Sequence, residues 1–177
     1  MKNRGFTMVE LMITIAVLSI ALSLAIPSFN TTIARNQLAA ARDDLIKSFQ
    51  FTKSEAINRN SNVSICPSTN GTSCSGTDNW EEGWIIYIDD DTGVDSAVGT
   101  ILKVNDGFDS VNTNHIGVPA GLDPSTFVRY VPQGFAAYAG PILAQTIEFC
   151  SPGGEVDAVS MVISAATGQV RPQAGGC

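Results

Sequence analysis

The sequence RGFTMVELMITIAVLSIALSLAIPSF, Arg4–Phe29, is almost entirely apolar and carries one carboxylate, Glu10, near its start. An α-helix rises about 1.5 Å per residue, so a helix over residues 6–26 would be roughly 30 Å long, the thickness of the hydrocarbon core of a bilayer. Lys2 and Arg4 precede the run, and the positive-inside rule predicts a cytoplasmic N-terminus with the rest of the chain outside. The segment therefore raises the question of why Glu10 is tolerated.

Two ordinary interpretations of this segment leave Glu10 unexplained. A secretory signal peptide with Ser23-Leu24-Ala25 as its cleavage site would have an apolar region of about 7–15 residues, whereas this run is longer and is interrupted by a carboxylate. A plain membrane anchor would bury that carboxylate at a cost on the order of 2.5–3.5 kcal/mol at the membrane centre, and less near the end. Because ionised residues inside membranes usually have a partner, an interpretation that supplies one is preferred.

The motif Gly5-Phe6-Thr7-Met8-Val9-Glu10-Leu11 resembles the class III signal of type IV pilins and type II secretion pseudopilins. The resemblance implies that a prepilin peptidase cuts after Gly5 and that the new N-terminal residue, Phe6, is N-methylated. It also implies that Glu10 pairs with the terminal amine of a neighbouring subunit in a filament core. Two opposite charges buried together cost less than either alone, so a neighbouring chain would explain why Glu10 is tolerated.

A second helix-forming segment follows the apolar run. Pro27 is expected to end or kink the first helix near the membrane face, as in many pilins, although a simple bend is the plainer alternative. From Thr31 to Asn60 there is no proline or glycine, and apolar residues at spacings of three and four predict an amphipathic helix that packs on a sheet. This stripe comprises Leu38, Ala41, Leu45, Phe49, Thr52 and Ala56. The charged face is expected either to be solvated or to contact neighbouring subunits.

After residue 62 the hydrophobic pattern alternates and glycine- and asparagine-rich turns separate short apolar runs. The expected strands are Val63–Cys66, Trp84–Ile88, Ile101–Val104, Phe127–Val131, Thr146–Cys150, Val159–Ser164 and Gln169–Arg171. We therefore expect an α+β pilin fold, with one long N-terminal helix packed on an antiparallel β-sheet domain. The expected organisation is a leader at residues 1–5, a transmembrane or filament-core helix at 6–29, an amphipathic helix at 30–60 and a β-rich periplasmic domain at 61–177.

Several motifs in the β-rich part narrow the resemblance. Ile65-Cys66-Pro67, Cys74 and Trp80-Glu81-Glu82-Gly83-Trp84 are similar to the GspH/FimT family of minor pilins and pseudopilins. The ending, Val162-Ile163-Ser164 through Thr167-Gly168-Gln169-Val170-Arg171, is similar to the closing strand pair of that family. Residues 107–145 match only loosely, apart from Pro132-Gln133-Gly134.

The charge distribution argues against nucleic acid as a partner. The chain has a formal net charge of −7, and from residue 61 onward thirteen acidic residues face only three basic ones. An acidic surface repels a phosphate backbone. Some members of the resembled family bind DNA through a Gly-Arg-x-Arg pattern in the closing hairpin, but this chain reads Gly168-Gln169-Val170-Arg171, with one arginine missing.

Four cysteines lie beyond the apolar run, at Cys66, Cys74, Cys150 and Cys177. If the run places them outside the cytoplasm, disulfides are the default expectation, and three pairings are possible. We favour Cys66–Cys74, which would close a short polar loop, and Cys150–Cys177, which would pin the C-terminal tail.

Metal binding and catalysis find little support in the sequence. Asp89, Asp91 and Asp95 lie at alternating positions around a glycine, which is a weak candidate for a calcium loop because the twelfth-position glutamate of an EF-hand is replaced by Thr100. An acidic hairpin turn is the simpler interpretation. No catalytic or nucleotide-binding motif is present in the sequence, so we expect neither an enzyme nor a cofactor.

These observations predict a minor type IV pilin that helps initiate or cap pilus assembly. The main alternative is the H-type minor pseudopilin of a type II secretion system, followed by a DNA-binding competence pilin and, as the plainest case, an anchored periplasmic domain. The expected partners are other pilins or pseudopilins, the prepilin peptidase and the bacterial inner membrane. The protein would span that membrane once, with its C-terminal domain periplasmic, before it enters a pilus or pseudopilus.

Overall fold

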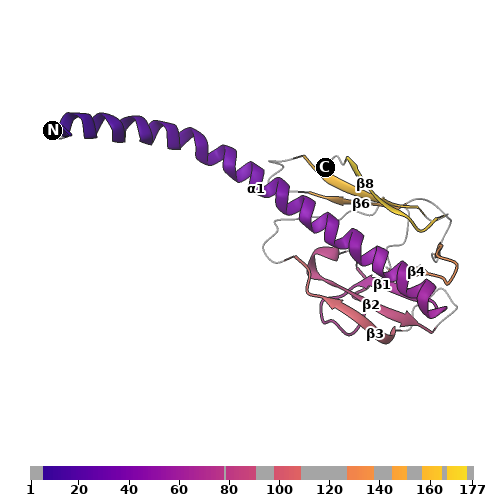
Figure 1. Ribbon diagram of the computed structural model, residues 1–177. Coiled ribbons are helices and arrows are strands. Elements are labelled where there is room, and N and C mark those ends of the chain that lie inside the picture. The colour runs from indigo at the N-terminus through magenta and orange to yellow at the C-terminus, as the bar shows by residue number, and fades with distance from the viewer. Residues whose placement is uncertain are drawn as a thin grey trace, which may run out of the picture.

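The computed structural model describes residues 6–77, 79–90, 98–108, 127–137, 145–150, 157–164 and 167–174. A long helix, α1 (Met8–Arg59), precedes the sheets, and its N-terminal part projects well beyond them (Figure 1). The other elements are β1 (Val63–Pro67), the 3-10 helix η1 (Trp80–Glu82), β2 (Trp84–Asp89), β3 (Val98–Asn105), β4 (Val128–Tyr130), β5 (Ala136–Ala137), β6 (Gln145–Phe149), β7 (Val159–Ile163) and β8 (Val170–Ala174).

The two helical segments expected from the sequence form one continuous helix. α1 begins after the N-cap residue Thr7 and ends at Arg59. The C-cap residue that follows, Asn60, has a φ of 52° in the left-handed region that asparagine tolerates. The helix does not end at Pro27, and instead it curves along its course (Figure 1). A proline inside a helix removes one backbone hydrogen bond but need only bend the helix, which agrees with the simpler of the two expectations.

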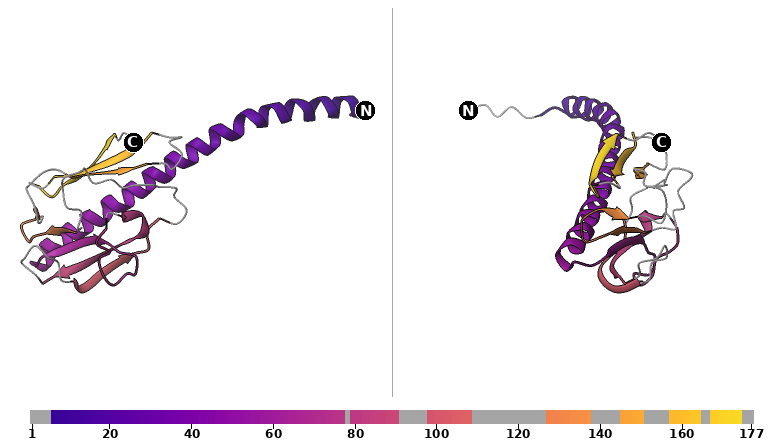
Figure 2. Two further views of the ribbon diagram at one scale, coloured as in Figure 1. Left: turned by 180° about the vertical axis from the view of Figure 1, so that it is seen from behind. Right: turned by 90° about the vertical axis from the view of Figure 1, so that its right-hand side faces the viewer.

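Two antiparallel sheets lie along the C-terminal half of α1 (Figures 1 and 2). The first sheet has the strand order β3-β2-β1-β4-β5, and the second has the order β6-β7-β8. Strand β1 is central because it pairs with β2 on one side, Ile65 opposite Ile86, and with β4 on the other, Val63 opposite Tyr130. The helix contacts both sheets, through β1 and β4 of the first and β7 and β8 of the second.

The apolar stripe predicted on the second half of the helix forms the core of the domain. All six of its residues are buried, and the five apolar ones pack with side chains from both sheets. The Phe49 ring lies 5.4 Å from the ring of Trp80, centroid to centroid. Burying a large apolar side chain stabilises a fold by roughly 1.5–3 kcal/mol, so this stripe is what fixes the sheets to the helix.

All seven expected strands are present, with ends that differ by a few residues. The largest differences are three residues long: β3 begins at Val98 rather than Ile101, because Val98 pairs with Asp89 of β2 beyond a register shift, and β8 ends at Ala174 rather than Arg171, because its pairing with β7 continues to Ala174. Strand β5 is not predictable from the sequence, since Ala136–Ala137 is too short to show an alternating pattern and is a strand through its pairing with β4. An N-terminal helix packed on antiparallel sheets confirms the expected α+β class.

A buried ion pair joins the strands of the first sheet. The Asp89 carboxylate, at the end of β2, accepts hydrogen bonds from Arg129 Nε of β4 at 2.8 Å and from Ser64 Oγ of β1 at 2.6 Å. The side chains of Asp89 and Arg129 are 0% and 8% exposed. Because a buried charge is costly unless it is paired, this cluster ties three neighbouring strands together at one end of the sheet.

Burial of Tyr130 makes the stability of the fold dependent on pH in the alkaline range. Burial raises the pKa of Tyr130 well above its ordinary value near 10. Below pH 10 the tyrosine is protonated in both the folded and unfolded chains. Above that pH the unfolded chain releases its proton while the folded chain keeps it, so the free energy of unfolding should fall as the pH rises.

The Tyr130→Phe variant should lack this part of the alkaline destabilisation. Its stability at pH 7 should stay close to that of the parent or rise slightly, because the Tyr130 hydroxyl is buried without a hydrogen-bond partner among the described residues. Thermal unfolding of both proteins from pH 8 to pH 11 measures the difference. Equal alkaline losses in the two proteins would contradict the assignment to Tyr130.

Candidate functional site

The N-terminal part of α1 presents an uncovered apolar surface. Every side chain from Phe6 to Ser23 is exposed, on all sides of the helix. The large apolar members are Phe6, Met8, Val9, Leu11, Met12, Ile13, Ile15, Val17, Leu18, Ile20 and Leu22. Soluble monomers rarely expose so much contiguous apolar surface, so this part of the helix needs a cover of protein or lipid. Within the described residues, no helix is both long enough and apolar enough to cross a membrane.

Glu10 is placed in the first turn of the helix. Thr7 is the N-cap, and its Oγ1 accepts a hydrogen bond from the Glu10 backbone N–H at 3.3 Å. The spacing Thr-x-x-Glu is that of a capping box, in which both residues stabilise the helix start. Glu10 is exposed, and none of the ion pairs between described residues includes it. No charged residue occurs between Glu10 and Arg35, so this carboxylate is isolated on an apolar helix.

The predicted processing site lies at the beginning of the described chain. Phe6 is exposed, and it precedes the helix in a non-helical segment with Thr7. Gly5 and the rest of the leader lie outside the described residues. Cleavage after Gly5 and methylation of Phe6 therefore stay predictions.

The predicted Cys66–Cys74 disulfide is present in the structure. The bond joins β1 to the loop that follows it, with the two Cα atoms 5.6 Å apart. Cys150 is also disulfide-bonded. Cys177, its predicted partner, lies outside the described residues, so that pairing stays a prediction.

Removal of the Cys66–Cys74 bond should lower the stability of the domain. The bond closes a loop with a sequence separation of 8, and a loop of that size corresponds to about 2–3 kcal/mol of unfolding free energy in the chain-entropy model. The Cys66→Ala/Cys74→Ala double variant should therefore unfold at a lower urea concentration than the parent. The control is the parent protein under the same oxidising conditions, in which the disulfide of Cys150 stays intact in both proteins. An unchanged urea midpoint in the double variant would contradict the expectation.

The calcium hypothesis gains no support from the position of Asp89. Its carboxylate faces the Arg129 guanidinium and the Ser64 hydroxyl in the buried cluster, rather than an open loop. Asp91 and Asp95 lie outside the described residues. No group of three or more potential metal-binding side chains occurs in the described part of the chain.

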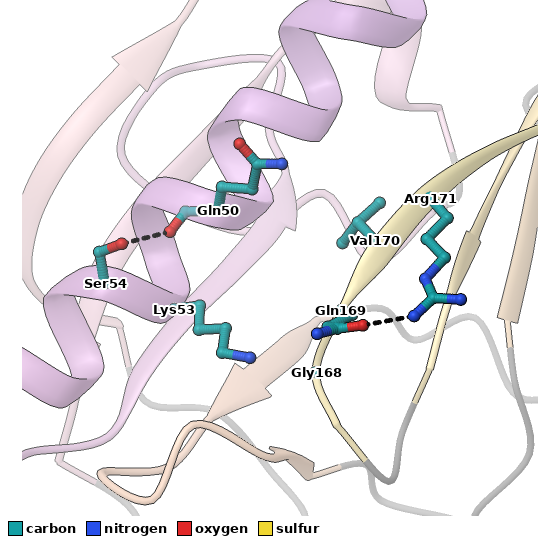
Figure 3. Close-up of a pocket in the computed structure, with 7 residues that line it drawn as sticks. All are labelled: Gln50, Lys53, Ser54, Gly168, Gln169, Val170 and Arg171. Atoms are coloured by element: carbon teal, nitrogen blue, oxygen red, sulfur yellow. Dashed lines mark hydrogen bonds between the residues drawn. The ribbon is translucent and has the colours of Figure 1, made fainter.

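The closing hairpin and α1 line an open pocket of about 350 Å³ at the surface of the domain. Figure 3 shows Gln50, Lys53 and Ser54 on the helix side, and Gln169 and Arg171 on the hairpin side. Lys53 Nζ donates a hydrogen bond to the Thr167 carbonyl oxygen at 2.7 Å and so holds the turn of the hairpin against the helix. The sequence motif singles out Arg171 but does not predict that Lys53 lines the same pocket. Lys53 and Thr167, which belongs to the same hairpin as Arg171, are 114 residues apart in the chain.

Comparison with known families agrees with this architecture. Residues 41–167 match the family described as Type II transport protein GspH, which is more than half of the chain. The chain belongs to the GspH family. Residues 1–26 match the prokaryotic N-terminal methylation motif, which covers Gly5, Phe6 and Glu10. The GspH match begins at Ala41, in the buried half of α1, and ends at Thr167, in the turn before β8.

The GspH-family chain is also similar in fold to two crystal structures of the type IV minor pilin FimU from Pseudomonas aeruginosa. The structure in space group P21 has a TM-score of 0.57 and 20% identity, and the match covers 80% of this chain and 90% of FimU. The structure in space group P65 has a TM-score of 0.55 and 17% identity, with 76% and 91% covered. At such identities the likeness shows the fold alone. No curated protein matches the sequence.

Proposed function

We propose that the protein is a minor type IV pilin, a structural subunit that helps initiate or cap the assembly of a pilus. The observation that carries the proposal is the exposed apolar part of α1 with its single carboxylate, Glu10, joined to a GspH-family domain. Neighbouring helices of a filament would cover the apolar surface. The description of FimU as a type IV minor pilin supports the same role.

In the proposed assembly pathway, the precursor is first inserted in the inner membrane. The residues after the leader form the membrane-spanning and later the filament-core segment, and the β-rich domain lies in the periplasm. The prepilin peptidase removes residues 1–5, and Phe6 becomes the methylated N-terminus, as the match to the N-terminal methylation motif supports. In the filament, Glu10 neutralises the terminal amine of a neighbouring pilin, because a lone carboxylate in an apolar core needs a cationic partner.

A second candidate is the H-type minor pseudopilin of a type II secretion system. The family description, Type II transport protein GspH, favours it. Both roles are structural, and neither requires a catalytic site or a cofactor. A DNA-binding competence pilin is less favoured, because only Arg171 remains of the arginine pattern and the surrounding domain is acidic.

A deletion strain of the source bacterium separates the two candidates. Surface pili are counted by electron microscopy, secreted proteins are assayed in the culture supernatant, and a complemented strain is the control. Loss of pili with normal secretion is the expected result. Normal pili with loss of secreted proteins would contradict the pilus role and establish the pseudopilus role.

A further inference from the structure

The pocket between α1 and the closing hairpin has an unbalanced positive charge. Among the described residues that line it, two are cations, Lys53 and Arg171, and none is acidic. The side chains of both cations extend toward that of Gln169, from either side in the view of Figure 3. A pocket with this lining favours an anion as its occupant.

Hydrogen bonds hold both cations in place without using all their donors. Lys53 Nζ donates to the Thr167 carbonyl oxygen at 2.7 Å, and a lysine ammonium has three donors. Arg171 donates from one terminal nitrogen to Gln169 Oε1 at 2.7 Å, and a guanidinium has five. The backbone N–H of Gln169 bonds to Thr167 Oγ1, which further fixes the turn. The pocket is thus a preorganised set of donors with capacity left for a carboxylate.

The neighbourhood of the pocket indicates a protein as the source of that carboxylate. Gly134 packs against Lys53 and Ile57, since a Cβ at Gly134 would lie 3.1 Å from Ile57 Cδ1 and 3.2 Å from Lys53 Cε. Ile57 and Phe135, the residue after Gly134, are 47% and 51% exposed. Exposed apolar side chains beside a fixed charged group are typical of a protein interface.

The net charge of the domain favours a single carboxylate over a polyanion as the occupant of the pocket. Thirteen acidic and three basic residues follow residue 60, and Arg129 is already paired with Asp89 inside the sheet. A nucleic acid would bring one phosphate charge after another against this acidic surface. A single Asp or Glu side chain would place its one negative charge in the pocket, beside Lys53 and Arg171, and would bring no further charges against the acidic surface. A second acidic domain of the same kind carries many such side chains.

We propose that this pocket binds the carboxylate of an Asp or Glu side chain from the globular domain of an adjacent filament subunit. The proposal rests on the proposed function, because filament packing is what brings a neighbouring domain alongside α1. Arg171 and Lys53 form charge-assisted hydrogen bonds with the carboxylate. Ile57 and Phe135 pack against the neighbouring domain beside the pocket. The contact fixes the rotation of one domain relative to the next, which the apolar helices alone would leave poorly specified.

Zero-length carbodiimide crosslinking tests the proposal on the full-length protein in its native membranes and filaments. The reagent joins an amine to a carboxylate only when the two are in contact, so peptide mapping should find Lys53 linked to an Asp or Glu of another chain. The Lys53→Arg variant keeps the charge and lacks the amine, and it should lose this link. The Arg171→Gln variant should reduce the Lys53 link about fivefold, the effect expected of one exposed charge contact. Lys103→Gln, which removes one charge from β3, is the matched control and should leave the link unchanged.

A second crosslink separates failure of this proposal from failure of the proposed function. A photoreactive benzophenone amino acid at Leu18, in the exposed apolar part of α1, should capture another subunit whenever filaments form. A Leu18 crosslink to another subunit without any link from Lys53 to another chain would overturn the pocket proposal and leave the filament role standing. Absence of both crosslinks would overturn both.

Discussion

Replacement of Arg129 with methionine is expected to lower the free energy of unfolding by about 3–5 kcal/mol. The guanidinium faces the Asp89 carboxylate, with Nε and Oδ2 2.8 Å apart, and the Asp89 side chain is fully buried. Methionine fills part of the space but removes the positive charge. The Asp89 carboxylate then stays in a low-dielectric interior without its cationic partner. The loss is large because the attraction inside the sheet is lost while the desolvation cost of the carboxylate remains.

Urea unfolding of the full-length protein in detergent, followed by the fluorescence of Trp80 and Trp84, measures this loss. Arg59→Met is the matched control, because Arg59 pairs with Glu55 on the exposed end of α1, and its loss should cost at most about 1 kcal/mol. The Arg129→Met/Asp89→Leu double variant should recover much of the stability, since an apolar pair can replace a buried ion pair. A single Arg129→Met variant as stable as the Arg59→Met control would contradict the expectation.

The Glu10→Gln variant is expected to enter filaments about a hundredfold less efficiently than the parent, as loss of one partner from a buried charge pair implies. Glutamine occupies nearly the same volume and can still serve in the capping box with Thr7, so α1 should form normally. The variant removes only the negative charge that the amine of a neighbouring subunit would meet. Cleavage of the leader should persist, because the carboxylate is not part of the Gly5–Phe6 bond.

The readout is the share of processed subunit in sheared filaments against the share left in membranes, by quantitative immunoblot. Thr14→Val is the matched control, since Thr14 lies one turn along the same exposed helix and its hydroxyl bonds only locally, to the Leu11 carbonyl oxygen at 2.8 Å. It should assemble like the parent. Equal filament incorporation of Glu10→Gln and Thr14→Val would show that the charge of Glu10 has no role in assembly.

Local patterns in the sequence predict the helix and every strand except β5, but they do not predict how these elements are arranged. The stripe from Leu38 to Ala56 predicted the buried helix face because its period is that of an α-helix. The alternating runs predict the strands because their period of two residues is that of a β-strand. The order β3-β2-β1-β4-β5 and the separate β6-β7-β8 sheet were not predictable, since they depend on which distant strands meet.

The groups that sequence analysis missed are those created by long-range contacts. Asp89 was considered as a calcium ligand because it stands in an acidic run, whereas in the fold it meets Arg129, 40 residues away, inside the sheet. The cation pair of the pocket also depends on tertiary structure, because Lys53 belongs to the helix and Arg171 to the closing hairpin. Glu10 was identified without the structure, because an isolated carboxylate in an apolar segment is unusual in any context.

The most direct test of the filament-subunit role is an intact mass of the protein purified from membranes of the source bacterium. A pilin-class subunit predicts a chain that begins at Phe6, with residues 1–5 lost and one methyl group added at the new N-terminus. Fragmentation of the N-terminal peptide would place that methyl group on Phe6. A chain that retains Met1 to Gly5, or that has been cut after Ala25 as a secretory signal peptide would be, would contradict the role.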